Sequence, residues 1–336
     1  MARHPEPLDS GPRSNSDTVA IQEALQSAGG ESTMLRSLLC PVDLSEHSGH
    51  ALRWAAVFAT RFQSRLTVLS VVEPLLAEAA RNRFGRDVAT ADTEHALQDF
   101  VAAATPERGA PALQTTLQVQ VGNPADVIVE TARSDAMDLI VMGTQGLQGV
   151  MKWVLGSTTE RVLRHTPTPV LAVPWPLDET NLTRLADVPI DLGRILIATD
   201  FSEASLLAAT FAVRLAQHFS VPVSFVHIIE SPIVPSRWRG LMEESGQARV
   251  TQARMALTQL AERFADSRDY ETIAVVGRPS DAIASVAADR GATLIVLGLA
   301  ADQGRLAPRP GSIAYRTLCS STLPVLVVPA SVKVAA

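Results

Sequence analysis

The feature that most limits the fold of this chain is an internal duplication. The segment RILIATD at 194–200 repeats SLLCPVD at 37–43, and its final residue, Asp200, follows Asp43 by 157 residues. VGRPSDAIASVA repeats VGNPADVIVETA, and PVLVVP repeats PVLAVP, both 155 residues later. A nearly constant spacing through two halves of a chain marks a tandem repeat. We therefore expect one domain to occur twice.

The length of 336 residues fits two domains of roughly 150 residues each. The repeats predict a flexible N-terminal tail at 1–34, a first domain at 35–175, a linker at 176–192 and a second domain at 193–330. The tail and the linker are polar and lack a sustained hydrophobic period, which is typical of segments without a packed core.

Within the first copy, short apolar runs alternate with segments of helical length. We predict strands at 34–43, 66–72, 115–121, 138–142 and 169–173. We predict helices at 46–62, 124–134 and 158–165, and one long helix at 73–104. The first helix would share one apolar face formed by Ala51, Trp54, Ala55, Phe58 and Phe62. Strands joined by helix-length connections predict an α/β fold, with a parallel sheet and helices on both of its faces.

The segment between the fourth strand and its helix is rich in glycine. It reads GTQGLQGVMKWVLGS and places Gly143, Gly146, Gly156 and Ser157 in the spacing G-x-x-G-x9-G-S. Glycine allows sharp turns and a close approach of a ligand to the main chain. The start of a helix offers N–H groups and a positive dipole to anions. We expect a phosphate site here, with Ser157 capping the helix, donating its hydroxyl to a phosphate oxygen, or both.

In this order and in two copies, these motifs resemble the universal stress protein family. The first copy carries the resemblance in PVDLSEHSGHALRWA, VGNPADVIVETA and the glycine segment followed by PVLAVP, and the second in ATDFSEAS, VGRPSDAIASVA and PVLVVP. The resemblance implies two Rossmann-like domains of the adenine nucleotide alpha hydrolase type, each a five-stranded parallel sheet of order 3-2-1-4-5. It also implies that the last strands of the two copies pair about a pseudo-two-fold axis, because an exposed apolar edge favours a partner.

The resemblance further implies that the first domain holds ATP or another adenine nucleotide. The residues that it assigns to the adenine and ribose are Asp43 and Val71, and those it assigns to the ribose and phosphates are Gly143, Gly146, Gly156 and Ser157, with Thr158 as a further donor. From the residues alone, Asp43 could equally close a turn or cap a helix, and Val71 could be an ordinary strand residue. Whether Mg²⁺ bridges the phosphates stays open.

The second copy departs from the glycine pattern. Ala301 replaces the middle glycine, and the residues that follow, DQGRLAPRP, contain two prolines and two arginines. A Cβ at positive φ costs on the order of 1 kcal/mol, and the prolines stiffen the loop. We expect the second domain to bind nucleotide weakly or not at all, although Arg305 or Arg309 could meet a phosphate.

Composition excludes several classes of function. The net charge of −6 gives no basic surface for nucleic acid. The two cysteines, Cys40 and Cys319, lie in apolar segments and the histidines show no ligand spacing, so we expect neither a disulfide framework nor a metal site. No apolar run reaches the roughly 18 residues of a membrane span, and the N-terminus lacks the apolar core of a signal peptide. These features predict a soluble, cytoplasmic protein.

The sequence supports two functions. The first is a nucleotide-binding stress or signalling module with slow hydrolysis or none, because the chain lacks the G-x-x-x-x-G-K-[ST] loop. The alternative is a scaffold that binds other proteins and no nucleotide. An adenylating ligase or an electron-transfer flavoprotein would need further catalytic or flavin-binding regions, for which the chain has no spare domain. The protein partners, and whether two chains associate, stay open.

Overall fold

The computed structural model describes residues 34–84, 88–105, 113–144, 155–175, 190–230, 239–264, 270–302, 305–306 and 312–331. Residues Met34–Val332 belong to one compact unit. The predicted tail at 1–34 and linker at 176–192 lie almost entirely outside the described residues. We call 35–175 repeat 1 and 193–330 repeat 2.

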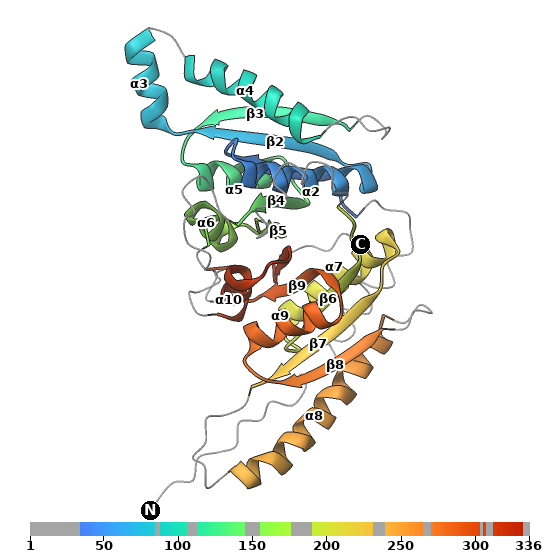
Figure 1. The fold of residues 1–336 in the computed structure, drawn as a ribbon. Coiled ribbons are helices and arrows are strands. Elements are labelled where there is room, and N and C mark those ends of the chain that lie inside the picture. Colours follow the sequence, from blue (N-terminus) through green and yellow to red (C-terminus); the bar gives the residue numbers. More distant parts are fainter. Residues whose placement is uncertain are drawn as a thin grey trace, which may run out of the picture. The chain divides into compact units, whose positions relative to one another are not determined.

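Repeat 1 alternates strands and helices (Figure 1). In chain order its elements are β1 (Ser37–Val42), α2 (Glu46–Phe62), β2 (Arg65–Val72), α3 (Pro74–Phe84), α4 (Val88–Ala104), β3 (Thr115–Val121), α5 (Pro124–Ser134), β4 (Leu139–Gly143), α6 (Ser157–His165) and β5 (Val170–Val173). The prediction of one long helix at 73–104 is wrong, because two helices, α3 and α4, occupy this region. Gly85 falls between them in the sequence, and glycine is a poor residue for a helix interior.

Repeat 2 has the same order of main strands. Its elements are β6 (Arg194–Ala198), α7 (Glu203–Phe219), β7 (Val223–Ile229), α8 (Arg239–Glu262), β8 (Glu271–Val276), α9 (Pro279–Asp289), β9 (Ala292–Leu299), β10 (Ala301–Asp302), β11 (Arg305–Leu306), α10 (Ile313–Ser320) and β12 (Val325–Pro329). One helix, α8, stands where repeat 1 has α3 and α4, and two short strands, β10 and β11, are added. The two short strands β10 and β11 form a separate antiparallel pair, which the sequence did not predict.

The strands of each repeat follow the predicted order 3-2-1-4-5. In detail the arrangement differs from two separate sheets, because one ten-stranded sheet runs β3-β2-β1-β4-β5-β12-β9-β6-β7-β8. Pairing is parallel within each repeat, and the last strands β5 and β12 pair antiparallel. Leu171 lies opposite Leu326, its equivalent 155 residues later. The register is therefore two-fold symmetric about this residue pair.

The sheet is covered by helices that pack on its apolar strands. In repeat 1, α2 contacts α4 while α5 contacts α6, and α2, α4 and α5 also have close contacts with the strands of this repeat. All residues of β1 are buried, as expected for a parallel strand covered on both faces. The predicted apolar face of α2 is confirmed, because its members are all buried, namely Ala51, Trp54, Ala55, Phe58 and Phe62.

The C-terminal turns of α2 and α7 meet in a symmetric contact. The Arg61 guanidinium donates to the His218 carbonyl at 3.1 Å, and His218 Nε2 lies 2.8 Å from the Arg61 carbonyl. The rings of Phe62 and His218 stack with centroids 3.9 Å apart, and Phe62 also meets Phe219. Because His218 and Phe219 follow Arg61 and Phe62 by 157 residues, equivalent residues of the two repeats face each other.

Candidate functional site

The predicted site lies where the carboxyl ends of β1, β2 and β4 meet. β1 pairs with β2 on one side and with β4 on the other. The connections that follow β1 and β4 therefore leave the carboxyl ends of these neighbouring strands in different directions. Such points are where open α/β sheets bind ligands. The structure thus brings Asp43, Val71 and Gly143 to the same side of the sheet, the carboxyl ends of its strands. Each of them lies close to the end of its own strand.

Asp43 forms a tight turn between β1 and α2. Its Oδ1 accepts hydrogen bonds from the Ser45 amide at 3.1 Å and the Ser45 hydroxyl at 2.5 Å. Between them, Leu44 has a φ of 61°, which costs a residue with a Cβ roughly 1 kcal/mol. Ser45 Oγ in turn accepts from the Ser48 amide and caps α2. The turn holds the exposed Asp43 carboxylate just after the carboxyl end of β1.

Val71 is a half-buried residue near the end of β2. It packs against the apolar core and pairs with Gln120 of the edge strand β3. These contacts explain the Val71 side chain as part of the packed core. A role toward a ligand would therefore rest on its main chain.

The start of α6 differs from the expected capping arrangement. The N-cap is Gly156, with φ −58° and ψ 141°, and no side chain of the described residues makes a capping hydrogen bond there. Ser157 is the first helical residue and is exposed, so the prediction that its hydroxyl caps the helix is wrong. A residue inside the first turn cannot place its own oxygen over the N–H groups that follow it, as an N-cap residue can. Thr158 follows it and is half-buried.

Two hydrogen bonds tie the start of α6 to the end of β4. The Gly156 amide donates to the Thr144 carbonyl at 2.8 Å. The Thr159 hydroxyl donates to the Gly143 carbonyl, also at 2.8 Å, and Thr159 is only 3% exposed. The sequence analysis missed Thr159, and its only signal was a third hydroxyl residue after Gly156. Gly146, which lies between these two ends, falls outside the described residues.

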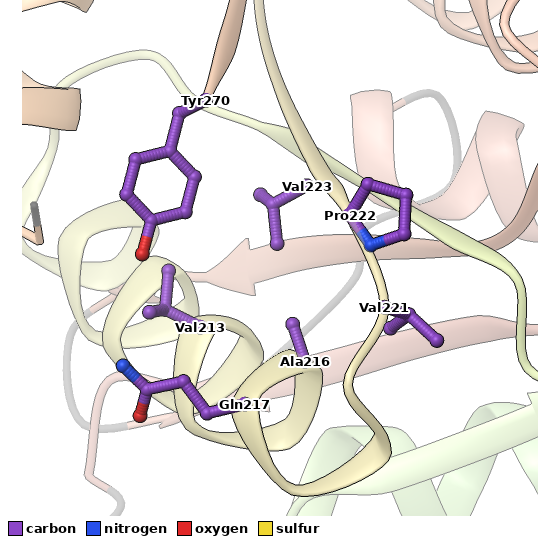
Figure 2. A pocket seen from close by; sticks show the side chains of 7 residues that line it. All are labelled: Val213, Ala216, Gln217, Val221, Pro222, Val223 and Tyr270. Carbon is purple, nitrogen blue, oxygen red and sulfur yellow. The ribbon is translucent and has the colours of Figure 1, made fainter. Parts of the chain in front are cut away.

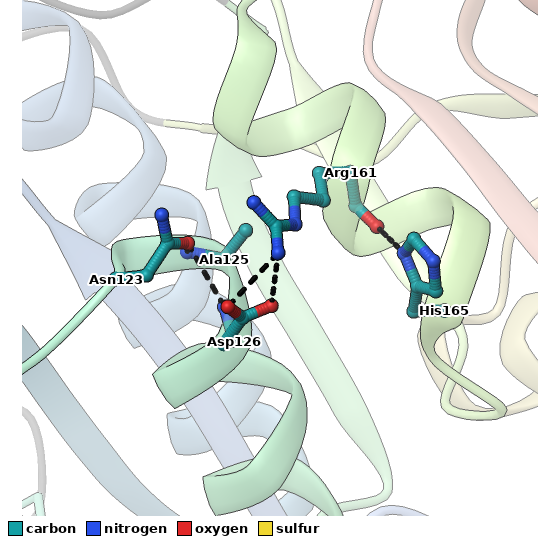
Figure 3. Close-up of polar contacts among 5 residues, drawn as sticks. All are labelled: Asn123, Ala125, Asp126, Arg161 and His165. Carbon is teal, nitrogen blue, oxygen red and sulfur yellow. Dashed lines mark hydrogen bonds and ion pairs between the residues drawn. The ribbon is translucent and has the colours of Figure 1, made fainter.

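The neighbouring helix α5 is fixed by its own cap and by an ion pair (Figure 3). The Asn123 side chain accepts from the amides of Ala125 and Asp126. The Arg161 guanidinium of α6 lies 2.8 Å from the Asp126 carboxylate of α5. Both side chains are about half exposed, so this pair contributes modestly to stability and serves mainly to orient α6.

Repeat 2 keeps the first turn of this site. Asp200 Oδ1 accepts from the amide and hydroxyl of Ser202 at 3.0 and 2.5 Å, and Phe201 between them has a φ of 63°. Burial works to raise the pKa of Asp200, but hydrogen bonds from Ser202 and Ser205 outweigh it and lower the pKa below its ordinary value. The turns after β1 and β6 are therefore the same structure.

Repeat 2 differs from repeat 1 in the described residues after its fourth strand. Ala301 lies in β10, which pairs with β11 in a hairpin that contacts α6 of repeat 1. Ser312 caps α10, because its Oγ accepts from the Tyr315 amide at 3.2 Å. Ala314 stands where repeat 1 has Thr159, so no hydroxyl is present to bond the strand. A Cβ at Gly298 would lie 2.4 Å from the main chain of Ala204, so this glycine is required for packing.

Other features of the described chain do not add to this site. Among its residues, no group of three or more His, Cys, Asp and Glu is placed to hold a metal ion. Burial raises the pKa of both cysteine thiols, those of Cys40 and Cys319. A small, mostly apolar pocket opens elsewhere, at the start of β7 (Figure 2). It is lined by Val213, Ala216, Gln217, Val221, Pro222, Val223 and Tyr270.

Comparison with known proteins agrees with the duplicated architecture. The model of the universal stress protein family matches residues 34–174 and again 192–329. A universal stress protein of Mycolicibacterium smegmatis is 26% identical over 301 residues, which cover 87% of this chain and 96% of that protein. One from Thermus aquaticus is 32% identical over 148 residues, which cover 42% of this chain and 99% of that protein.

Solved structures show the same fold. The crystal structure of a universal stress protein from Archaeoglobus fulgidus superimposes with a TM-score of 0.62 at 20% identity, covering 90% of this chain and all of that chain. The two family matches together span most of the sequence, and the chain therefore belongs to the universal stress protein family, with two copies of its domain. No helix in the described part of the chain is long and apolar enough to cross a membrane.

Proposed function

We propose that repeat 1 binds an adenine nucleotide, with ATP as the ligand, and that the protein acts as a nucleotide-dependent module in a stress response or in signalling. Repeat 2 does not hold a nucleotide in this proposal. The proposal also includes two expectations from the sequence, namely domain limits of 35–175 and 193–330 and a cytoplasmic setting.

The observation that carries the proposal is the uncapped start of α6. Among the residues that the structure describes, no side chain makes a capping hydrogen bond to its first turn, and this turn lies beside the carboxyl end of β4. Unpaired N–H groups at the positive end of a helix favour anions such as phosphate. The hydroxyl of Ser157 is exposed next to them and supplies a further donor.

The adenine and ribose would lie toward the turn after β1. The Asp43 carboxylate is held by Ser45 at the same edge of the sheet, and a carboxylate can accept a hydrogen bond from an adenine amino group or a ribose hydroxyl. The main chain at Val71 would border this end of the ligand. Gly143 and Gly146 would allow the phosphates to approach the main chain. If Mg²⁺ takes part, the phosphates would supply its principal ligands.

The proposed role is binding rather than catalysis. The sequence has no phosphate loop with its lysine, and the Asp43 carboxylate accepts a hydrogen bond from Ser45. A hydrolytic site would need a base that orients water at the terminal phosphate. We therefore expect ATP to be retained or hydrolysed only slowly.

Calorimetry with ATP tests this proposal. The native protein should bind ATP, and Gly143→Leu and Gly156→Leu should each weaken binding by roughly 10- to 100-fold, because the added side chain blocks access to the main-chain amides. Circular dichroism and thermal melting check that both variants remain folded. Unchanged affinity in both folded variants would refute the site.

The second candidate function is an interaction scaffold that binds no nucleotide. A specific observation favours it, since α3 exposes Leu75, Leu76 and Phe84 by 58–78%. Exposed apolar surface on a helix often marks a protein contact. Mass spectrometry of the freshly purified protein separates the two functions, because co-purified adenine nucleotide supports the first.

A further inference from the structure

We propose that Thr159 is a positioning residue that latches α6 to β4 and thereby sets the direction of the first-turn amides. The inference rests on the proposed function for its consequence, nucleotide affinity, but the latch itself is a property of the free protein. Thr159 does not belong to the set of residues assigned to the ligand.

The geometry of the bond distinguishes it from ordinary helix capping. Thr159 is the third residue of α6, and its hydroxyl reaches back 16 residues in sequence to the Gly143 carbonyl at 2.8 Å. The adjacent bond, from the Gly156 amide to the Thr144 carbonyl, has the same length. Two consecutive carbonyls at the end of β4 thus receive two donors from the start of α6.

These two bonds hold the two ends of the glycine segment together. Thr144 and Thr159 are 6% and 3% exposed, while Gly143 and Gly156 are half-buried, so the bonds are partly buried and their loss costs stability. The Thr144 amide is itself bound to the Val173 carbonyl of β5. The start of α6 is therefore fixed to the sheet through the end of β4. The orientation of the amides at Ser157 and Thr158 follows from this attachment.

Repeat 2 provides an internal comparison. Its equivalent of Thr159 is Ala314, which is buried and has no hydroxyl, and Ser312 caps its own helix instead. The latch therefore occurs in the repeat that keeps the full glycine pattern. A latch that positions amides for a ligand explains this restriction, whereas a general need to hold this helix on the sheet would apply to both repeats.

The test uses the full chain with Thr159→Val, Thr159→Ala and Thr159→Ser. The first two remove the hydroxyl, and the third keeps it. The control is Thr210→Val, which removes another buried threonine hydroxyl, bonded to the Leu206 carbonyl at 3.0 Å within α7. The first readout is hydrogen exchange of the Gly156 amide without nucleotide, measured by NMR. The second is the affinity for ATP with Mg²⁺.

We expect Gly156 exchange to be about 5-fold faster and ATP binding about 3- to 10-fold weaker in Thr159→Val and Thr159→Ala, as the loss of one buried hydrogen bond implies. Thr159→Ser should restore both to within about 2-fold of native, and Thr210→Val should change neither. Unchanged Gly156 exchange in the folded variants would overturn the latch. Faster exchange with unchanged affinity would overturn its positioning role. A native protein that binds no ATP would refute the proposed function, while the exchange data would still decide the latch.

Discussion

The two repeats share the turn after their first strand and differ at the connection after their fourth. Asp43 and Asp200 accept the same two hydrogen bonds from serines two residues later, across residues with φ near 60°. After β4, repeat 1 has an uncapped helix tied to the strand through Thr159. After β9, repeat 2 has the hairpin β10–β11 and a helix capped by Ser312.

This difference separates the structural role of a motif from its binding role. The aspartate turn is present in both repeats and stabilises the start of α2 and α7, so its presence alone does not identify a ligand site. In the described part of the connection after the fourth strand, repeat 2 forms the hairpin β10–β11 and caps α10 with Ser312, whereas the N-cap of α6 in repeat 1 is Gly156. The connection, rather than the aspartate, is therefore what distinguishes a binding repeat from a non-binding one in this account.

The largest expected effect concerns the contact between the repeats. Phe62 is 2% exposed, and Phe62→Ala should lower the free energy of unfolding by about 3–4 kcal/mol through lost burial and a residual cavity. Its equivalent Phe219 is half-buried, so Phe219→Ala should cost about half as much. Urea unfolding measures both values. Equal losses would contradict the difference in burial at otherwise symmetric positions.

The next effect tests why repeat 2 retains a glycine. Gly298→Ala should lower the free energy of unfolding by at least about 2 kcal/mol, because its Cβ would collide with the main chain of Ala204. Gly291→Ala is the control, since that position has a φ of 61° and open space around it, which predicts a cost of about 1 kcal/mol. A Gly298 variant as stable as the native protein in urea would refute a packing role for this glycine.

A third prediction concerns acid stability. Burial, together with the charge of Arg53, lowers the pKa of His50 to about 4, and its Nδ1 has no hydrogen-bond partner. In the unfolded chain the imidazole of His50 takes up a proton near pH 6.5. The free energy of unfolding should therefore fall by about 1–2 kcal/mol as the pH falls from 6.5 toward 4. Repeat 2 has Leu207 at the equivalent position, so the loss belongs to repeat 1.

His50→Leu should remove this part of the pH dependence. Urea midpoints for the native and variant proteins at pH 7.5 provide the baseline, and the two curves should diverge below pH 6.5, with the variant losing less stability. Curves that stay parallel down to pH 4 would show that His50 is not responsible.

The smallest effect compares the two serines at the starts of α6 and α10. Ser312→Ala should cost about 1 kcal/mol, because it removes a helix cap. Ser157→Ala should change stability by less than about 0.5 kcal/mol, because Ser157 caps nothing, and should instead weaken ATP binding. Thermal melting and calorimetry measure the two quantities. The comparison fails if Ser157→Ala proves as destabilising as Ser312→Ala.

Most regular elements could be predicted from residue patterns. α2 and β3 have the predicted bounds, because the helical period of α2 is sustained up to Gln63 and the alternation of β3 stops at Gly122. The hairpin β10–β11 was missed, because strands of two residues have no period to detect. The split between α3 and α4 was missed because alanine-rich sequence on both sides favours helix and only one glycine interrupts it.

The site was predictable only where a motif marks it. The spacing of Gly143 and Gly156 pointed to the end of β4 and the start of α6. The predicted capping role of Ser157 was wrong because the sequence does not fix a helix boundary to within one residue. The Thr159 bond joins two elements that only the tertiary structure brings together. The positive φ at Leu44 could not be predicted from the sequence, because leucine rarely adopts this backbone conformation.

Native mass spectrometry of the full chain with ATP and Mg²⁺ tests the central claim most directly, because it counts bound nucleotides. The account predicts one ATP per chain, lost in Gly156→Leu and retained in Gly311→Leu, the equivalent change in repeat 2. Two ATP per chain, with one lost in each variant, would contradict the assignment of binding to repeat 1. No bound ATP at millimolar concentration would contradict the nucleotide site altogether.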